Sequence, residues 1–211
     1  KKNKIKIFFG YVYLYNHYIK YIKKIISKKT LGSIKYINFQ RQNFGPIRDG
    51  VSSIFDLATH DLSILHFIFN KTSKLKKIVK HDLLNKNNYD ISYLNLEIGK
   101  IKVDINVSWL NPEKIRKIII IGSKKMLVFD EMNKTKPIQI YNNYVHFPKI
   151  DKFSKQFFGK TLYIFKGKSR SIKLNFTPPL DEEIKAFIKD KEIITNLNFS
   201  ENIIKTLSKK L

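Results

Sequence analysis

One stretch decides the fold: Ile91-Ser-Tyr-Leu-Asn-Leu-Glu-Ile98, then Gly99-Lys100, then Ile101-Lys-Val-Asp-Ile-Asn-Val-Ser-Trp-Leu110. Apolar and polar side chains alternate in both flanking runs, which is typical of strands that bury one face. The two residues between them form a tight hairpin signal, because glycine readily adopts the positive φ that such a turn needs. This part of the chain therefore predicts two antiparallel strands.

More runs of the same kind surround this hairpin. We expect strands at residues 4–13, 33–43, 75–84, 115–121, 125–130 and 138–141. Because no helical pattern interrupts the runs between Leu75 and Tyr141, they predict one mostly antiparallel open sheet, and the flanking helices are expected to cover one of its faces. The fold class predicted is α+β.

Helical spacing of apolar residues predicts helices at residues 16–29, 53–69, 181–189 and 200–209, with Ser200 as the N-cap of the last one. The second of these carries Asp56 and His60. At a spacing of four residues their side chains begin about 6 Å apart on one helix face. The pair can therefore orient an imidazole or hold one substrate hydroxyl, although an ordinary amphipathic helix is the alternative.

A histidine whose pKa lies near neutrality can accept the proton of an alcohol while that alcohol is oxidised. The other histidines share no ligand-like spacing with Asp or Glu, so a metal site is not expected. With no cysteine in the chain, disulfides and thiolate ligands are excluded.

Several motifs in order resemble the second domain of the glucose-fructose oxidoreductase / inositol dehydrogenase (Gfo/Idh/MocA) family. They are Leu31-Gly-Ser-Ile and Asn43-Phe-Gly-Pro-Ile-Arg48, Asp56-Leu-Ala-Thr-His60, Val107-Ser-Trp109-Leu-Asn-Pro112, and Ile121-Gly-Ser. The closest likeness is to members that oxidise nucleotide-linked amino sugars at carbon 3. The resemblance spans most of the chain, from Gly10 to Leu211.

The resemblance implies a division and a set of roles. Residues 1–30 would be the remnant of a Rossmann-type dinucleotide-binding domain with a junction helix, and residues 31–211 the α+β substrate-binding and oligomerisation domain. His60 and Asp56 would be catalytic, and Arg41, Arg48 and Asn16 would bind substrate, with a structural ion pair as the alternative for the arginines. NAD or NADP would be the cofactor.

Two features of that family are absent from these residues. No Gly-x-Gly-x-x-Gly and no Glu-Lys-Pro occur, so the phosphate-cradling turn and the catalytic lysine of the resembling enzymes are missing. We therefore expect this chain to be a fragment that is inactive alone and does not hold the dinucleotide tightly.

The strongly positive net charge would by itself favour nucleic acid as a partner, but the kind of basic residue does not. The net charge is +24, with 41 Lys and Arg against 17 Asp and Glu. Only four of the basic residues are arginine, the residue that suits phosphate and guanine best. Scattered Lys, Ile, Asn, Tyr and Phe indicate coding bias, so nucleic-acid binding is not expected. No apolar run approaches the roughly 20 residues that cross a bilayer, and a cytoplasmic location is the default expectation.

Three functions remain. The first is the substrate domain of an NAD(P)-dependent oxidoreductase that acts on a sugar or nucleotide-sugar hydroxyl, assembled as a homo-oligomer through the open face of its sheet. The second is a non-catalytic oligomerisation module or relic. The third is a basic protein that binds polyanions.

Overall fold

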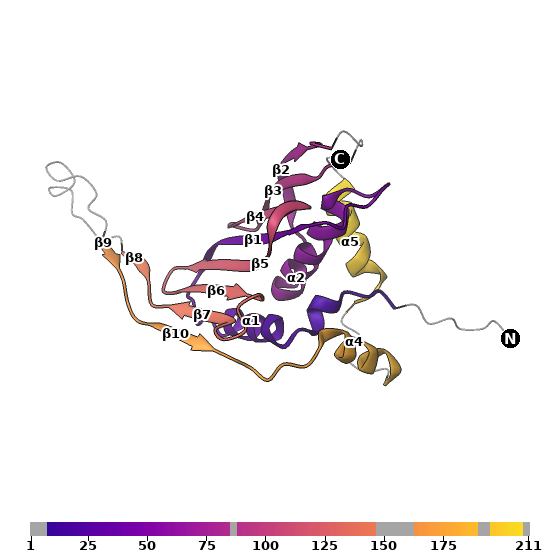
Figure 1. Ribbon diagram of the computed structural model, residues 1–211. Helices are drawn as coiled ribbons and strands as arrows, with labels where there is room; N and C mark the ends of the chain where they lie inside the picture. The colour runs from indigo at the N-terminus through magenta and orange to yellow at the C-terminus, as the bar shows by residue number, and fades with distance from the viewer. Residues whose placement is uncertain (1–7, 85–87, 147–162, 190–194, 209–211) are drawn as a thin grey trace, which may run out of the picture.

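The computed structural model describes residues 8–84, 88–146, 163–189 and 195–208 (Figure 1). Eight strands form one sheet in the order β10-β7-β6-β5-β1-β4-β3-β2. Their bounds are β1 Ile34–Phe44, β2 Lys74–His81, β3 Ile91–Ile98, β4 Ile101–Ser108, β5 Leu110–Gly122, β6 Met126–Asp130, β7 Ile138–Tyr141 and β10 Ser169–Ile172. All neighbours are antiparallel except β1 and β4, which are parallel. The predicted α+β class is confirmed.

The helices gather on one side of this sheet (Figure 1). They are the 3₁₀ turn η1 (Val12–Tyr15), α1 (His17–Ser27), the π-helical turn η2 (Ile54–Ala58), α2 (Thr59–Phe69), α4 (Pro179–Ile188) and α5 (Leu197–Ser208). Two short strands, β8 (Tyr144–His146) and β9 (Tyr163–Phe165), pair separately from the main sheet. No helix in the described ranges is long and apolar enough to span a membrane.

The core lies between the sheet and α1 and α2. On β1 the odd-numbered Ile37, Phe39 and Arg41 are buried while their even-numbered neighbours are half-buried, as expected when one face of a strand packs against helices. α1 contributes Ile19, Ile22 and Ile25 to the same core, at helical spacing. None of the described helices packs against the face that carries the even-numbered β1 residues.

The hairpin predicted from Gly99-Lys100 is confirmed. Ile98 pairs with Ile101, and Gly99 has a φ of +57°. The strand at residues 115–121 is longer than predicted. It already begins at Leu110 and accommodates Pro112, although proline cannot donate a ladder hydrogen bond.

Two local expectations are wrong. Residues 12 and 13 belong to the 3₁₀ turn η1 and not to a strand. The next two residues of this turn, Leu14 and Tyr15, are both buried, whereas successive side chains of a strand point to opposite faces of the sheet. Residues 1–7 lie outside the described part. The last helix begins at Leu197, since Asn196 Oδ1 accepts the backbone N–H of Phe199 as a cap, so Ser200 is not its N-cap.

His66 joins the end of α2 to the start of β2. Its Nε2 accepts the backbone N–H of Ser73 at 3.1 Å, which places the proton of the neutral ring on Nδ1. Burial lowers the pKa of His66 to about 4. Protonation of Nε2 would also turn an acceptor toward the Ser73 N–H into a second donor, so the native contact requires the neutral ring.

This histidine predicts a pH dependence of stability. The folded pKa lies below the unfolded value of about 6.5, so the unfolded chain binds more protons between these pH values. The stabilisation is complete above about pH 6.5 and is lost as the pH falls toward about 4. In His66→Gln, where the amide can still accept the Ser73 N–H, the loss of unfolding free energy from about pH 7.5 to about pH 4.5 should be smaller by on the order of 2 kcal/mol.

Urea unfolding of both proteins at the two pH values measures this difference. His60 titrates in both the wild type and His66→Gln, so its contribution cancels in the comparison. Identical losses in the wild type and in His66→Gln would contradict the assignment.

Candidate functional site

Asp56 is held by two side chains from elsewhere in the chain. Its Oδ2 accepts the indole N–H of Trp109 at 2.9 Å, and its Oδ1 lies 3.2 Å from Nε of Arg48. It stands in the π-helical turn η2, where the backbone is wider than in an α-helix. Arg48, for which the sequence left substrate binding or a structural ion pair open, thus forms an ion pair with Asp56 in this structure. The side chain of Arg48 is largely exposed.

Trp109 is a rigid support for that carboxylate. It is fully buried, its backbone N–H donates to the carbonyl of Asp90, and its carbonyl accepts the N–H of Gly45. Tryptophan usually buries its ring and keeps the indole N–H for one hydrogen bond, as it does here. The carboxylate of Asp56 is thus fixed at the junction of β4 and β5.

His60 follows one turn later and is half-buried. Its ring centroid lies 5.2 Å from that of Tyr13 in η1. Burial, and then the positive charge of Arg41, lower the pKa of His60 to about 4, while Asp61 and Asp56 act in the opposite direction. The hypothesis from the sequence assumed a pKa of His60 near neutrality, and desolvation lowers that pKa. At neutral pH the ring is uncharged and can accept a proton.

Asp56 and His60 lie on neighbouring turns but are not hydrogen-bonded to one another in the described structure. Both oxygens of Asp56 already contact Trp109 and Arg48. Its influence on His60 is electrostatic, raising the pKa of the imidazole. A charge placed in this way favours the imidazolium form once a proton has been accepted.

Arg41 forms a buried ion pair with Asp61 of α2. Its Nε and Nη2 donate to Oδ1 at 2.9 and 2.7 Å, and both residues are less than 5% exposed. The guanidinium also lies over the ring of Tyr13, 4.2 Å from its centroid. The sequence left substrate binding or a structural ion pair open for Arg41, and the structure shows the ion pair.

Arg116 is partly buried. It pairs in register with Arg41 across β1 and β5 and donates to the carbonyl of Gln42 and to Oδ1 of Asn43. Its charge also lowers the pKa of His60. Two guanidinium groups therefore lie on the helix side of the sheet beside the histidine.

Asn16 is the N-cap of α1. Its Oδ1 accepts the N–H of Tyr18 at 2.8 Å, and its Nδ2 lies 3.4 Å from Oε1 of Glu131, which follows β6. Burial raises the pKa of Glu131 although Arg41 and Arg116 act against it. Asn16 and Glu131 both line a cavity of about 700 Å³ next to Tyr13. Asn16 is thus a structural cap whose amide also borders a hollow.

The structure brings His60, Asp56, Arg48 and Arg41 into one cluster, and places Asn16 on the cavity beside it through Tyr13. Sequence reasoning did not assign roles to Trp109, Tyr13 or Glu131. Trp109 had a usable signal, since it is the single tryptophan of the chain. Tyr13 and Glu131 had none, because only the folded chain brings η1 and the end of β6 together.

The geometry fits general-base chemistry near a cavity that is lined by both polar and apolar side chains. A neutral imidazole flanked by a fixed carboxylate can accept a proton from a hydroxyl group, and the cavity offers room for the rest of a substrate. Among the described residues there is no group of three His, Asp or Glu side chains that could hold a metal ion.

The fold is thus an open, mostly antiparallel sheet whose described helices, including the one that carries His60, lie against one face. The C-terminal domain model of the GFO/IDH/MocA family matches residues 19–128, just over half of the chain. The chain belongs to that family. No curated protein sequence matches it.

Solved structures with the same fold have low sequence identity to the chain. An NAD binding oxidoreductase from Klebsiella pneumoniae has a TM-score of 0.70 at 13% identity, covering 94% of this chain and 61% of its own. UDP-N-acetylglucosamine 3-dehydrogenase from Acidithiobacillus ferrooxidans has 0.65 at 15%, covering 94% and 58%. A 3-ketoreductase from Actinomadura kijaniata, in complex with TDP-benzene and NADP, has 0.69 at 9%, covering 96% and 58%.

These values establish the shared fold. The chain spans about three fifths of the length of each of these structures.

The two ion pairs of the site should differ strongly in their contribution to stability. Asp61→Asn leaves the Arg41 charge buried and unpaired, so it should lower the unfolding free energy by about 3–5 kcal/mol. Arg48→Gln removes one charge of an exposed pair and should cost less than about 1 kcal/mol. Denaturant unfolding at neutral pH measures both, and equal costs would refute this view of Arg41.

Proposed function

We propose that these 211 residues are the substrate domain of an NAD(P)-dependent oxidoreductase that acts on a sugar or nucleotide-sugar hydroxyl. The observation that carries the proposal is a neutral His60 one turn from the fixed carboxylate of Asp56, with its ring against Tyr13, a residue that lines a cavity. Membership of the GFO/IDH/MocA family supports the redox class. The sugar is inferred, since one structure with this fold is an inositol dehydrogenase homolog from Azotobacter vinelandii complexed with NADH and myo-inositol.

In this proposal His60 accepts the hydroxyl proton of the substrate on a ring nitrogen. Asp56 stabilises the resulting imidazolium by its charge, and Trp109 and Arg48 keep that carboxylate in place. A bound nicotinamide would supply the hydride acceptor for the carbon that carries the hydroxyl.

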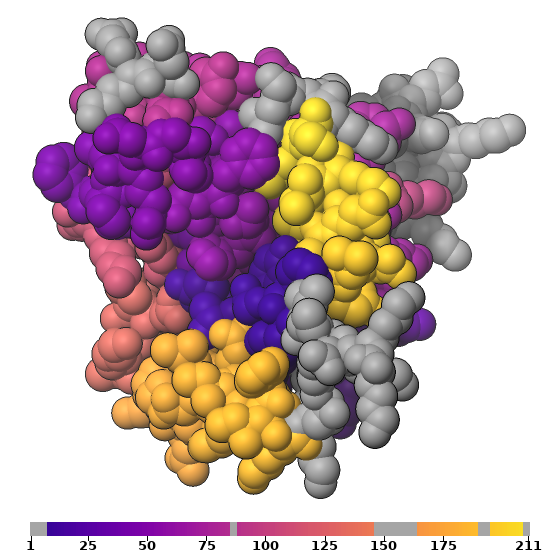
Figure 2. Space-filling view, turned by 90° about the vertical axis from the view of Figure 1, so that its right-hand side faces the viewer, coloured from indigo at the N-terminus to yellow at the C-terminus, as the bar shows by residue number. Residues whose placement is uncertain are grey.

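The chain has no Gly-x-Gly-x-x-Gly turn, so these residues do not fit the usual cradle for a dinucleotide pyrophosphate. We assign that cradle to a separate dinucleotide-binding domain. Its packing surface is the exposed apolar stripe of α4, formed at helical spacing by Leu180, Ile184, Phe187 and Ile188. Phe187 contacts Phe8 at 5.4 Å, so this stripe adjoins the N-terminal segment, which Figure 2 shows between the two C-terminal helices.

The same proposal includes a homo-oligomer formed through the helix-free face of the sheet. At the centre of that face lie the half-buried side chains Ile119, Ile121, Met126 and Val128, in register on β5 and β6. A non-catalytic assembly module would use this face as well. Sedimentation of Val128→Glu should show a smaller species than the wild type, and an unchanged mass would remove the face from the proposal.

The catalytic assignment predicts unequal effects of three substitutions in a form that includes a dinucleotide-binding domain. His60→Ala should lower kcat by about a hundredfold to ten-thousandfold, with little change in KM. Asp56→Asn retains a hydrogen bond to Trp109 but removes the charge, so it should lower kcat and shift the acid limb of the pH profile to lower pH. Steady-state kinetics across pH measures both effects.

His66→Ala serves as the matched control, because His66 contacts Ser73 and not the cavity. It should leave kcat intact and reduce stability. Wild-type turnover in His60→Ala would show that His60 is not the proton acceptor.

The 211-residue chain alone should bind NAD or NADP only weakly, since it lacks the backbone cradle for the pyrophosphate. Calorimetric titration at physiological salt tests this. Micromolar affinity for either nucleotide would mean that these residues hold the cofactor themselves.

A further inference from the structure

A small pocket lined by basic side chains lies between α1 and the β10 edge of the sheet (Figure 1). Its volume is about 260 Å³, and four of its ten lining residues carry a positive charge. They are Lys24 of α1, Lys28 at the end of that helix, Lys125 in the β5–β6 turn and Arg170 of β10. None of the described aspartates and glutamates lines this pocket, which is called here the basic pocket.

The register of the sheet directs Arg170 toward α1. Arg170 pairs with Ile140 of β7, and residues directly opposite one another on antiparallel strands place their side chains on the same face. Through Leu127 and Ile120, Ile140 is in register with Ile37, which is buried on the face that the helices cover. A guanidinium group of the edge strand is therefore brought to the lysines of a helix that is distant in sequence.

Arg170 differs from the other three arginines of the chain in having no partner. Arg41 and Arg48 form ion pairs with aspartates, and Arg116 donates to backbone and amide oxygens. In the described part of the chain, no acceptor contacts the guanidinium group of Arg170, and no carboxylate oxygen lies within 4 Å of the three lysine ammonium groups of the pocket. Four uncompensated positive charges thus border one small volume.

The C-terminus of α1 offsets little of this charge. The partial negative charge of a helix end resides on carbonyl groups that lack a donor. Here the carbonyls of Lys24, Ile25 and Ile26 accept the backbone N–H groups of residues 28, 30 and 29, at 3.1, 3.1 and 2.9 Å. Because these carbonyls already have donors, the positive charge of the pocket remains available to an anion.

Neutral side chains complete the wall of the basic pocket. The hydroxyl of Thr30 and the amide of Asn142 line it, and both groups can donate hydrogen bonds to an oxyanion. Ile25 and Ile140 are buried and form an apolar part of the wall. Charge interactions are stronger where apolar side chains exclude water from one side.

We propose that the basic pocket binds a compact anion with two phosphoryl groups, of which inorganic diphosphate is the simplest. The planar fork of an arginine matches phosphoryl oxygens, and lysine ammonium groups add charge-assisted hydrogen bonds. The volume of about 260 Å³ lies below the roughly 300–1,000 Å³ of pockets that enclose larger ligands. The pocket therefore suits the diphosphate itself and does not enclose a nucleoside.

This pocket is separate from the surroundings of His60. Arg116, whose charge acts on His60, lies five positions before Ile121 on β5, and Ile121 pairs with Met126, the residue after Lys125. Five residues of a strand span about 17 Å. The inference goes beyond the proposed function, and it holds whether or not His60 is a base.

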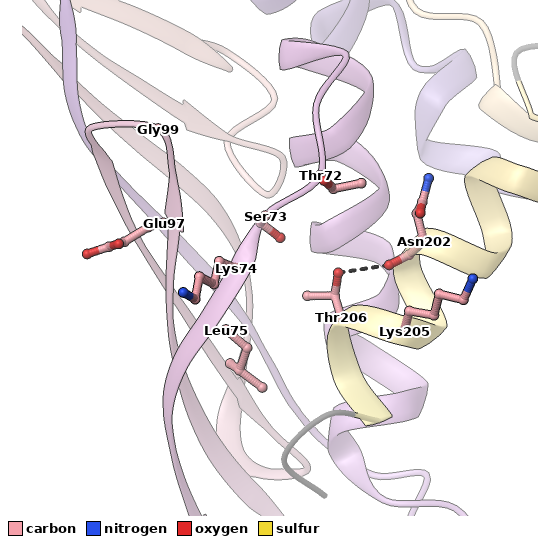
Figure 3. Close-up of a pocket in the computed structure, with 9 residues that line it drawn as sticks. All are labelled: Thr72, Ser73, Lys74, Leu75, Glu97, Gly99, Asn202, Lys205 and Thr206. Atoms are coloured by element: carbon pink, nitrogen blue, oxygen red, sulfur yellow. Dashed lines mark hydrogen bonds between the residues drawn. The ribbon is translucent and has the colours of Figure 1, made fainter.

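A second hollow that contains lysines provides a control. It lies between β2, the β3–β4 turn and α5 and is called here the α5 hollow (Figure 3). The ammonium groups of its Lys74 and Lys205 point to opposite sides in Figure 3, and Lys205 is paired with Glu201 at 2.7 Å. The α5 hollow thus carries two lysines without convergence, in a chain whose net charge of +24 attracts anions everywhere.

The test is calorimetric titration of the 211-residue chain at about 0.15 M salt, which screens diffuse attraction. The probes are inorganic phosphate, inorganic diphosphate, ADP and a single-stranded oligonucleotide. Diphosphate should bind on the order of tenfold or more tightly than phosphate, because it offers more oxygens to the four cations. If ADP binds like diphosphate, a terminal diphosphate is sufficient; if ADP does not bind, the free anion is the ligand.

Two double variants that remove the same amount of charge locate the binding. Lys125→Gln/Arg170→Gln should weaken the binding of diphosphate on the order of tenfold or more, and Lys74→Gln/Lys205→Gln should change it less than about twofold. Arg170→Lys keeps the charge but loses the planar fork, so its affinity should lie between those of the wild type and of Lys125→Gln/Arg170→Gln.

Thermal unfolding gives a second readout, because a ligand that binds only the folded chain raises its Tm. Diphosphate should raise the Tm of the wild type and of Lys74→Gln/Lys205→Gln alike, and leave that of Lys125→Gln/Arg170→Gln almost unchanged. Equal weakening by both double variants, equal affinity for phosphate and diphosphate, or no binding of diphosphate would overturn the proposal. So would ADP binding on the order of tenfold more tightly than diphosphate, or binding of the oligonucleotide alone.

Discussion

The buried ion pair between Arg41 and Asp61 is the interaction on which the rest of the site depends. It joins β1 to α2, and the same guanidinium lies over Tyr13 of η1. Three segments that are distant in sequence are therefore fixed relative to one another by one side chain. A buried charge of this kind must be paired, because leaving it unpaired costs several kcal/mol. Asp61 directly follows His60, so the pair also fixes where the histidine ring lies.

The charge of Arg41 influences two titrating groups in its surroundings. It lowers the pKa of His60 by like-charge repulsion, in the same direction as burial. It also acts to lower the pKa of Glu131, but burial is the larger effect there, and that pKa is raised. A neutral base and an acid that retains its proton more easily than usual thus lie on either side of Tyr13. This division of roles suits the recognition of hydroxyl groups, which both donate and accept hydrogen bonds.

The sequence predicted most of the fold because local patterns dictate it. The alternation in residues 91–110 and the glycine at position 99 specify the hairpin, and the spacing of Ile19, Ile22 and Ile25 specifies α1. The residues around the 3₁₀ turn η1 could not be assigned in this way, because two adjacent buried side chains there follow neither period. The partner of Asp61 could not be predicted for a similar reason: it is 20 residues away on a strand, and only the folded chain brings the two together. Glu131 was missed because its surroundings are assembled from η1, α1 and β6.

The protonation state of His60 tests this account most directly. It can be followed by NMR titration of the imidazole resonances in the 211-residue chain, with the urea-unfolded chain as reference at about 6.5. The structure predicts that His60 in the folded chain titrates with a pKa of about 4, because it is desolvated and lies near the buried Arg41. A folded-state pKa close to that of the unfolded chain would contradict the central claim that the Arg41–Asp61 pair organises this site and influences the protonation state of His60.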